Sequence, residues 1–130
     1  IKELPEELFI NCVKIENLLL WKNFLTSLPS NTFANLAELI WIDLSSNRLT
    51  SLNAHHFCNT KQLEKVRLQG NKLTSIDARI FDNQDFLRLV DLHDNICINK
   101  AYGNAGIKGA FVRQRDQFKK IVATYCPKKF

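Results

Sequence analysis

Two tryptophans and one histidine are the side chains of this 130-residue chain whose types are best suited to binding or catalysis. Indole rings are favoured anchors of protein interfaces, so Trp21 and Trp41 are candidates for a binding surface. His93 stands beside Asp91 and Asp94, and an imidazole next to carboxylates can transfer protons or ligate a metal ion. Each role needs partner side chains from elsewhere in the chain, so the elements that position these residues decide between the roles.

The chain repeats with a period of 24 residues, and this period determines which side chains become neighbours. The block Leu39–Gln62 and the block Leu63–Phe86 carry similar residue types at the same offsets. Chance does not produce so many coincidences at one spacing, so we expect a solenoid of about four repeats. The aligned columns are Leu39/Leu63/Leu87, Ile42/Val66/Val90, Leu44/Leu68/Leu92, Leu28/Leu52/Ile76, Asn23/Asn47/Asn71/Asn95 and Phe9/Phe33/Phe57/Phe81.

Each block is expected to contain a short strand, a turn and a return segment. A stretch such as Trp41-Ile42-Asp43-Leu44 alternates between outward and inward residues, which is the period of a strand. The asparagine that follows offers both donors and an acceptor, so we expect it to satisfy backbone groups of the turn. The phenylalanine of the return segment is expected to fill the outer side of the core. These repeated positions build the fold and carry no information about a ligand.

The pattern LxxLxLxxNxLxxLPxxxFxxLxx, clearest at Ile15–Glu38, resembles the 24-residue leucine-rich repeat of extracellular animal proteins. The resemblance implies an α/β repeat fold, a right-handed solenoid with a parallel sheet on its concave side and irregular or short helical turns on its convex side. The repeats are expected over residues 1–96. They start in the middle of a repeat, because Ile1–Pro5 aligns with Leu25–Pro29. We interpret this start as a truncation, and the alternative is that another molecule covers this end.

Repetition stops after Asn95, and residues 97–130 are expected to form a C-terminal cap. The glycine-rich stretch Gly103–Gly109 predicts a flexible connection. Ala110–Tyr125 predicts one amphipathic helix, laid over the last coil. Its apolar face is expected to carry Phe111, Phe118, Val122 and Tyr125.

The element Asn95-Ile96-Cys97-Ile98-Asn99-Lys100, followed by a later cysteine, is similar to the cap of secreted insect leucine-rich-repeat proteins. The mosquito leucine-rich immune proteins are members of that group. Cys97 leaves the last strand region and Cys126 closes the cap helix, so we expect a disulfide between them and an oxidising compartment. Cys12 and Cys58 lie two repeats apart, which exceeds the reach of a disulfide. We expect both to be small buried thiols, with a bridge to another chain as the alternative.

The outward residues of the strands are expected to form columns on the concave face, and both tryptophans lie in these columns. Contiguous exposed aromatic surface marks an interaction site, although packing against upstream repeats or a covering partner would also account for Trp21 and Leu19. The expected binding residues are Leu19, Trp21, Trp41, Asp43, Lys65, Arg67, Gln69, Leu89, Asp91 and His93.

The row Asp43–Arg67–Asp91 alternates in sign across adjacent strands. We expect it to be a mutually satisfied ladder that stabilises the sheet slightly, and the alternative is that it orients a polar ligand. His93 can approach Asp91 on the same strand, but nothing supplies a nucleophile, a third strong ligand or a closed pocket. We therefore expect no enzyme activity, no metal and no cofactor. His55 and His56 fall in a convex turn and are expected to be solvated.

Charge is distributed unevenly along the chain. Residues 1–96 hold ten basic and twelve acidic side chains, whereas residues 97–130 hold eight basic ones and a single acid, Asp116. This basic cap is expected to be a solvated helix face and tail, with attraction of an anionic partner as the alternative. Nucleic acid is not expected, because no aromatic stacking face accompanies the charge. No apolar run is long enough to span a membrane.

These observations predict a secreted, non-catalytic recognition module that binds a protein, or alternatively a glycan, on its concave face. The resemblance to mosquito immune proteins implies a role in innate immunity. The alternative function is a structural module that docks partners through its open N-terminal edge or its basic cap.

Overall fold

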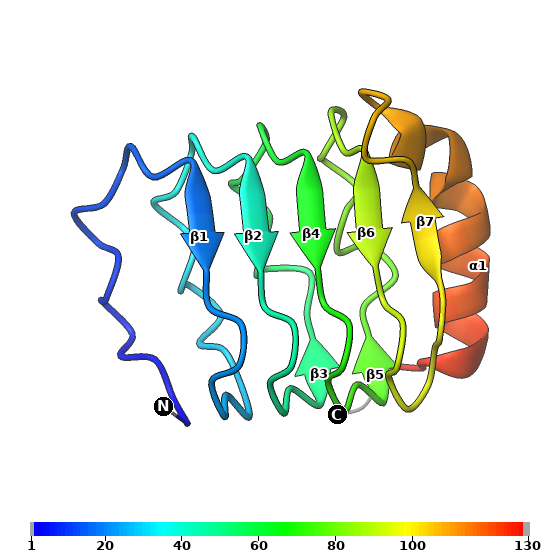
Figure 1. Ribbon diagram of the computed structural model, residues 1–130, viewed down its shortest axis with the longest axis horizontal. Coiled ribbons are helices and arrows are strands. Elements are labelled where there is room, and N and C mark those ends of the chain that lie inside the picture. The colour runs from blue at the N-terminus through cyan, green and yellow to red at the C-terminus, as the bar shows by residue number, and fades with distance from the viewer. Residues whose placement is uncertain (1, 129–130) are drawn as a thin grey trace.

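The computed structural model describes residues 2–128, and its strands follow the period of the sequence. Four strands begin 24 residues apart and lie side by side (Figure 1). They are β1 (Asn17–Leu19), β2 (Trp41–Asp43), β4 (Lys65–Arg67) and β6 (Leu89–Asp91). All three pairs formed by these strands are parallel, and residues one period apart stand opposite each other, as Leu18, Ile42 and Val66 do. The leucine-rich-repeat solenoid expected from the sequence is confirmed.

The return segments are mostly turns, with one small second sheet. β3 (Ser51–Leu52) and β5 (Ser75–Ile76) pair in parallel at the convex side of the second and third full coils. Phenylalanine rings stack along this side at centroid distances of 6.4, 5.7 and 5.6 Å. The stack ends against Phe111 and Phe118 of the C-terminal segment, whose rings lie 5.7 Å from Phe81. The core is therefore one continuous column from the first coil to the cap.

The asparagine column joins each coil to the preceding one. Asn71 donates from Nδ2 to the carbonyl oxygens of Leu44 and Leu68, both at 3.0 Å, and its Oδ1 accepts the N–H of Leu49 at 3.1 Å. Asn47 and Asn95 repeat this arrangement one coil earlier and one coil later. The side chain thus satisfies backbone groups of two adjacent coils at once, as its donor and acceptor inventory predicts.

The stretch Gly103–Gly109, predicted to be a flexible connection, begins with the last residue of a strand and continues as turns. β7 (Ala101–Gly103) pairs antiparallel with β6 and completes a five-stranded sheet in the order β1-β2-β4-β6-β7. Tyr102 is fully buried, with its ring 5.5 Å from that of Phe118. Gly103 has a φ of +93°, and a Cβ on it would lie 1.9 Å from the carbonyl oxygen of Arg88. A glycine is therefore required for the close approach of β7 and not for flexibility.

The cap contains two helical pieces where one helix was predicted. A 3₁₀-helix, η1 (Ala110–Gln114), precedes α1 (Arg115–Tyr125), which stands beside β7 at the far end of the sheet (Figure 1). The break falls at Gln114, where φ is −109° and the side chain accepts the N–H of Gly103 at 2.8 Å. Phe111, Phe118 and Val122 are buried as expected.

The expectation for Tyr125 was wrong, because its side chain is 62% exposed. Cys126, in the next position, is fully buried and occupies the space against the last coil. It forms the expected disulfide with Cys97, which ties the end of α1 to the residues that follow β6. Cys12 and Cys58 are free thiols, and both are half-buried instead of fully buried as the sequence predicted.

Candidate ligand-binding face

The outward side chains of β1, β2, β4 and β6, with the turn residues two positions beyond them, make up the concave face. The parallel register brings all ten residues expected from the sequence onto this face. Their exposure is unequal. Leu19, Trp21 and His93 are exposed, whereas Trp41, Asp43, Lys65, Arg67, Gln69, Leu89 and Asp91 are half-buried.

The two tryptophans lie in different environments. Trp21 is 48% exposed, next to Leu19, which is 52% exposed, and Lys22 Nζ lies 5.2 Å from the centroid of its ring. Trp41 is half-buried, and Lys65 Nζ lies 4.8 Å above its ring. Trp21 can therefore contact a partner directly, whereas Trp41 presents its ring together with a cation.

A hollow of about 280 Å³ borders Trp41 at the N-terminal ends of the strands. Glu64 and Arg88 close one side of it through an ion pair, with Arg88 Nε 2.7 Å from Glu64 Oε1. Trp41 Nε1 is shielded from solvent and has no hydrogen-bond partner among the described residues. The hollow therefore offers an aromatic wall, one lysine and a paired carboxylate, which suits a side chain of a protein partner. It is lined by Asn17, Ile40, Trp41, Glu64, Lys65, Arg88 and Ala105.

The aspartates of the concave face are engaged in their own turns. Asp43 Oδ1 accepts the N–H of Ser45 at 3.0 Å and its hydroxyl at 2.6 Å. Asp91, two repeats after Asp43 in the chain, accepts the N–H of His93 on its Oδ1 at 3.0 Å in the same way. These bonds support a turn whose next residue has a positive φ, of 56° at Ser46 and 55° at Asp94. One carboxylate oxygen of each aspartate is thus committed to the backbone.

The charge ladder predicted for this face is only half formed. Arg67 Nη1 lies 3.9 Å from Asp91 Oδ2, but Arg67 and Asp43 form no ion pair. An exposed or half-exposed pair at this distance contributes little to stability. The free oxygen of Asp43 and the guanidinium of Arg67 are therefore available to a partner.

His93 and Asp91 form a pair, with Nδ1 of the imidazole 2.8 Å from Oδ1 of the carboxylate. Within residues 2–128, no group of three His, Cys, Asp or Glu side chains is arranged to hold a metal ion. The same carboxylate oxygen also accepts the His93 N–H, so the pair fixes the orientation of the imidazole within its turn.

His56, which was expected to be solvated, is buried. Its Nδ1 accepts the N–H of Asn53 at 3.1 Å and its Nε2 donates to the carbonyl oxygen of Leu28 at 3.0 Å. Burial lowers the pKa of His56, although the bond to Leu28 opposes this effect and the nearby His55 adds to it. His56 is therefore a neutral structural link between two coils and lies away from the concave face.

The acids of the last convex turn pair with much of the cap's positive charge. Arg115 donates to the carbonyl oxygen of Gln84 at 2.7 Å, and its Nη2 lies 3.7 Å from Asp85. Lys119 pairs with Asp82 at 2.8 Å. The basic composition of the cap thus reflects in part the docking of α1 on the last repeat.

A similar arrangement surrounds Asp77. Hydrogen bonds from Arg79 hold the pKa of Asp77 well below its usual range, and Lys128 Nζ, at 3.5 Å, adds to the effect. Both oxygens of this buried carboxylate contact Arg79, at 3.1 and 2.9 Å. Ion pairs therefore join the cap to the last convex turn.

Among solved structures the chain is similar to three insect leucine-rich-repeat proteins. It aligns with the structure of the Drosophila Toll–Spatzle complex at 36% identity and a TM-score of 0.71, covering 73% of this chain and 13% of the other. The leucine-rich-repeat domain of mosquito APL1 aligns at 28% identity and 0.71, covering 73% and 25%. That of APL1B aligns at 30% identity and 0.68, covering 74% and 28%.

The chain therefore spans between 13% and 28% of the length of these structural relatives. No curated protein matches the sequence. Residues 13–73 match the family model described as Leucine rich repeat. Together with the strand period and the asparagine column, this match identifies the repeat array of the chain as a leucine-rich-repeat domain, of the kind found in insect APL1 and Toll.

Proposed function

We propose that the chain is a non-catalytic recognition module that binds a protein on its concave face. The observation that carries the proposal is that Leu19, Trp21, Trp41 and Lys65 lie on this one face, on three neighbouring strands and the turn after the first. Leu19 and Trp21 are about half exposed and lie on the first strand and its turn, and the Trp41–Lys65 pair follows on the next two strands. Large aromatic side chains with adjoining cations are typical centres of protein interfaces.

Polar groups next to this surface would set the orientation of the partner. Arg67 lies on β4 with Lys65, and Asp91 and His93 lie on β6 and in the turn after it. The turn after β2 leaves one oxygen of Asp43 free. Leu89 and Gln69 complete the surface. A protein partner suits this mixture better than a glycan, because the hollow beside Trp41 is small and two of its three bordering charges, Glu64 and Arg88, are paired with each other.

The proposed setting is extracellular and immune. The Cys97–Cys126 disulfide is of a kind that persists in oxidising compartments. None of the helices in the described part of the chain has the length and apolar character that a membrane crossing requires. The Toll–Spatzle structure is described as a molecular hub in development and innate immunity, which supports secretion and an immune role for this chain as a proposal.

The proposal is tested by capture from insect haemolymph on the immobilised chain, with retained proteins identified by mass spectrometry. We expect the variant carrying Trp21→Ala and Trp41→Ala to lose the proteins that the wild type retains, because the two indoles are the anchors. Trp21→Ala alone should weaken their capture at least about tenfold, and its exposed position leaves the core intact.

The matched control is Tyr125→Ala, which removes an exposed aromatic side chain from the cap. It should retain the same proteins as the wild type. Equal retention by the wild type and by both tryptophan variants, each with a native circular dichroism spectrum, would reject the concave face as the binding site.

A further inference from the structure

One row of side chains crosses the turns that follow the concave strands. It takes one exposed residue from each coil, at the position directly after the asparagine of that coil. We call it the turn row. These turns follow the arrowheads of β1, β2, β4 and β6 in Figure 1, so the row borders the proposed binding face along one side. Its members are Phe24, Arg48, Lys72 and Ile96.

The turn row has apolar ends and a basic middle. Ile96, at 65%, is more exposed than the other large apolar side chains among residues 2–128, and Phe24 is 53% exposed. The guanidinium of Arg48 lies over the ring of Phe24, with Cζ 4.7 Å from the ring centroid. Exposed apolar side chains next to an arginine are typical of interaction surfaces.

The two cations of the row lack acidic partners. Four of the six arginines in the described residues pair with a carboxylate, at 2.7 to 3.9 Å. Arg48 is not among them, and Lys72 forms no ion pair with a described residue either. The two side chains are exposed and stand at the same offset in adjacent coils, which lie about 4.8 Å apart. Because like charges at such a spacing repel each other, an acidic group of a partner would remove a repulsion that the free chain retains.

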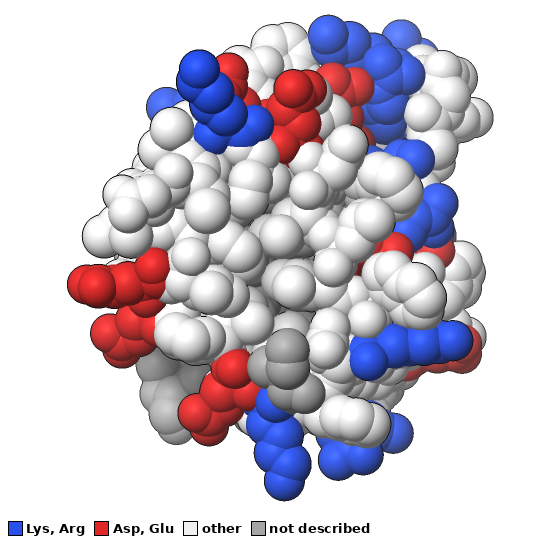
Figure 2. Space-filling model, turned by 60° about the vertical axis from the view of Figure 1, so that its left-hand side comes forward, with Lys and Arg blue, Asp and Glu red and all other residues white. Residues whose placement is uncertain are grey.

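The surroundings leave the middle of the row positive. Two residues to either side of each of its cations stands a serine, a glycine or a threonine. In the outer coils, Lys22 precedes the row with a further cation, and Asp94 precedes it with an acid. Figure 2 shows basic side chains projecting at the lower right of the molecule, at the end of the coils that carries the row.

The backbone holds the turn row in place. The N–H groups of Arg48 and Lys72 donate to carbonyl oxygens of the preceding coil, at 2.8 and 2.9 Å. In the last coil the equivalent bond comes from Cys97 instead of Ile96, and the disulfide to Cys126 fixes that cysteine. A surface that is ordered before binding loses little conformational entropy when a partner covers it.

We propose that the protein partner of the concave face presents an acidic segment to the turn row, with carboxylates over Arg48 and Lys72 and an apolar side chain against Ile96. The inference rests on the proposed function, because it names the chemistry of the protein bound there. An acidic protein segment fits the row better than an anionic glycan, since a glycan would leave its apolar ends without contact. The row spans about 14 Å from the first coil to the last, which about four or five residues of an extended segment cover.

Selection of a phage-displayed library of random peptides, of about 12 residues, on the immobilised chain tests this chemistry. We expect the enriched peptides to carry two or more acidic residues close to an aliphatic or aromatic one. One enriched peptide is then synthesised with a fluorescent label. Its anisotropy gives the dissociation constant for the wild type and for each variant.

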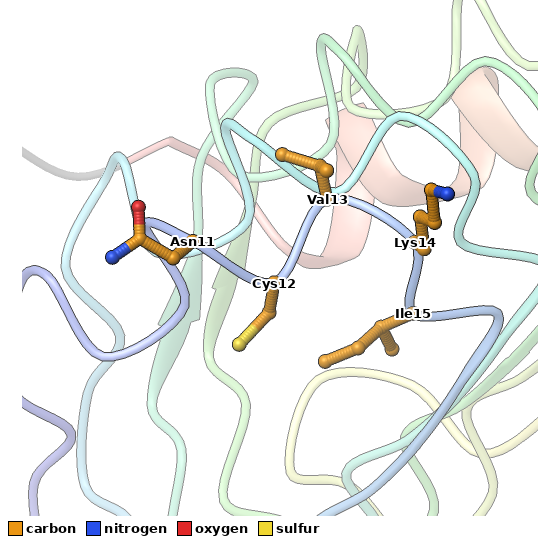
Figure 3. Close-up of a pocket in the computed structure, with 5 residues that line it drawn as sticks. All are labelled: Asn11, Cys12, Val13, Lys14 and Ile15. Atoms are coloured by element: carbon orange, nitrogen blue, oxygen red, sulfur yellow. The ribbon is translucent and has the colours of Figure 1, made fainter.

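Arg48→Glu together with Lys72→Glu should raise the dissociation constant of that peptide at least about tenfold, because two attractions become repulsions. The matched control combines Lys14→Glu with Lys120→Glu, which change the net charge equally at other places. Figure 3 shows Lys14 in a hollow of about 570 Å³ at the opposite end of the first coil, and Lys120 is exposed on α1. The control should bind the peptide within about twofold of the wild type.

The apolar contact is tested separately. Ile96→Ser should raise the dissociation constant at least about threefold, because the partner's apolar side chain would lose its contact. Ile107→Ser makes the same change at a side chain 47% exposed in the cap loop, and it should leave the constant unchanged. All of these substitutions replace exposed side chains, so each variant should retain a native circular dichroism spectrum.

Enrichment of no acidic peptide, or an acidic peptide bound equally by the wild type and by the Arg48 and Lys72 variant, would overturn the proposal. Binding of heparin by the wild type but not by that variant, without any enriched peptide, would assign the row to an anionic glycan and overturn it too. The variant carrying Trp21→Ala and Trp41→Ala should still bind the peptide, because its indoles lie outside the row. Unchanged haemolymph capture by this tryptophan variant would reject the concave anchors and leave the peptide result intact.

Discussion

At the residue scale, several polar side chains of this chain form hydrogen bonds with backbone groups that would otherwise lack a partner. His56 joins Asn53 to Leu28 across a buried turn. Asp43 and Asp91 accept N–H groups two residues further on. A solenoid turns sharply in every coil, so it leaves many backbone groups that hydrogen-bond neither within a helix nor within a sheet. Side chains at fixed offsets supply the missing partners.

Stability should depend on pH through His56. A proton on its Nδ1 would remove the acceptor of the Asn53 N–H, and burial lowers its pKa below the ordinary 6.5. The unfolded chain therefore binds more protons than the folded one between that lowered pKa and about 6.5, and stability falls as the pH drops through this window. Urea unfolding at pH 7.5 and at pH 5, at about these values, should show the difference between wild type and His56→Gln shrinking at the lower pH.

His55→Gln is the matched control, because His55 is exposed. Its unfolding free energy should follow that of the wild type at both pH values. A constant difference between the wild type and His56→Gln across the range would show that the imidazole does not titrate with folding.

At the element scale, β7 is the segment that converts the last repeat into a closed end. It pairs with β6, buries Tyr102 and donates the N–H of Gly103 to Oε1 of Gln114 in η1. The pKa of Tyr102 is raised by burial, in keeping with its position between the sheet and Phe118. The cap therefore begins with a strand that pairs with the last repeat strand, β6, in the antiparallel direction.

Gly103→Ala should destabilise the chain by at least about 2–3 kcal/mol. The new Cβ would meet the carbonyl of Arg88 at 1.9 Å, and alanine disfavours a φ of +93°. Urea unfolding measures the loss. Gly106→Ala, whose Cβ would lie 3.4 Å from its nearest neighbour, Asn104 Oδ1, should change the unfolding free energy by less than about 1 kcal/mol. Equal effects of the two substitutions would contradict the close approach of β7.

The elements that repeat could be predicted from the sequence, and so could the cap helix and its disulfide, but β7 and the break between η1 and α1 could not. The strand register, the phenylalanine stack and the asparagine bonds follow from one period, because every column supplies three or four observations of the same environment. β7 has no such column, and its glycines are equally typical of a loop. The break at Gln114 depends on a contact with Gly103 that no local pattern records.

The sequence predicted which side chains share the concave face, but it did not predict how far each of them is exposed. The period placed Trp21, Trp41 and Arg67 on one face, since residues one period apart are opposite each other. Which of them is exposed depends on neighbours such as Lys65, which covers the ring of Trp41. Arg67 pairs with Asp91 and not with Asp43, although both aspartates support the same kind of turn, and the alternation of charge does not distinguish them.

At the scale of the whole molecule, the stability of each coil depends on the adjacent coils, because each repeat packs only on its neighbours. The C-terminal end is closed by α1, by ion pairs with the last convex turn and by the Cys97–Cys126 bond. The last repeat is therefore held by contacts of three different kinds.

Replacement of both Cys97 and Cys126 by serine should lower the unfolding free energy by about 3–4 kcal/mol, the value expected for a loop of this length. Hydrogen exchange should locate the loss first in α1 and β7, which the bond ties to the last coil. Replacement of Cys12 and Cys58 by serine, the control, removes no bond and should cost less than about 1 kcal/mol. Faster exchange beginning in β1 in the disulfide variant would contradict this order.

The asparagine column has one more consequence, which concerns length. Each asparagine bonds only to its own coil and to the one before it, so no contact in the array specifies how many coils there are. Deletion of one complete repeat between Asn23 and Asn95 would leave residues of the same column next to each other in adjacent coils. Deletion of one residue fewer would shift the register, so that each asparagine beyond the deletion would face a residue from a different column. Such a chain can grow or shrink in whole units over evolution without any redesign of its interior.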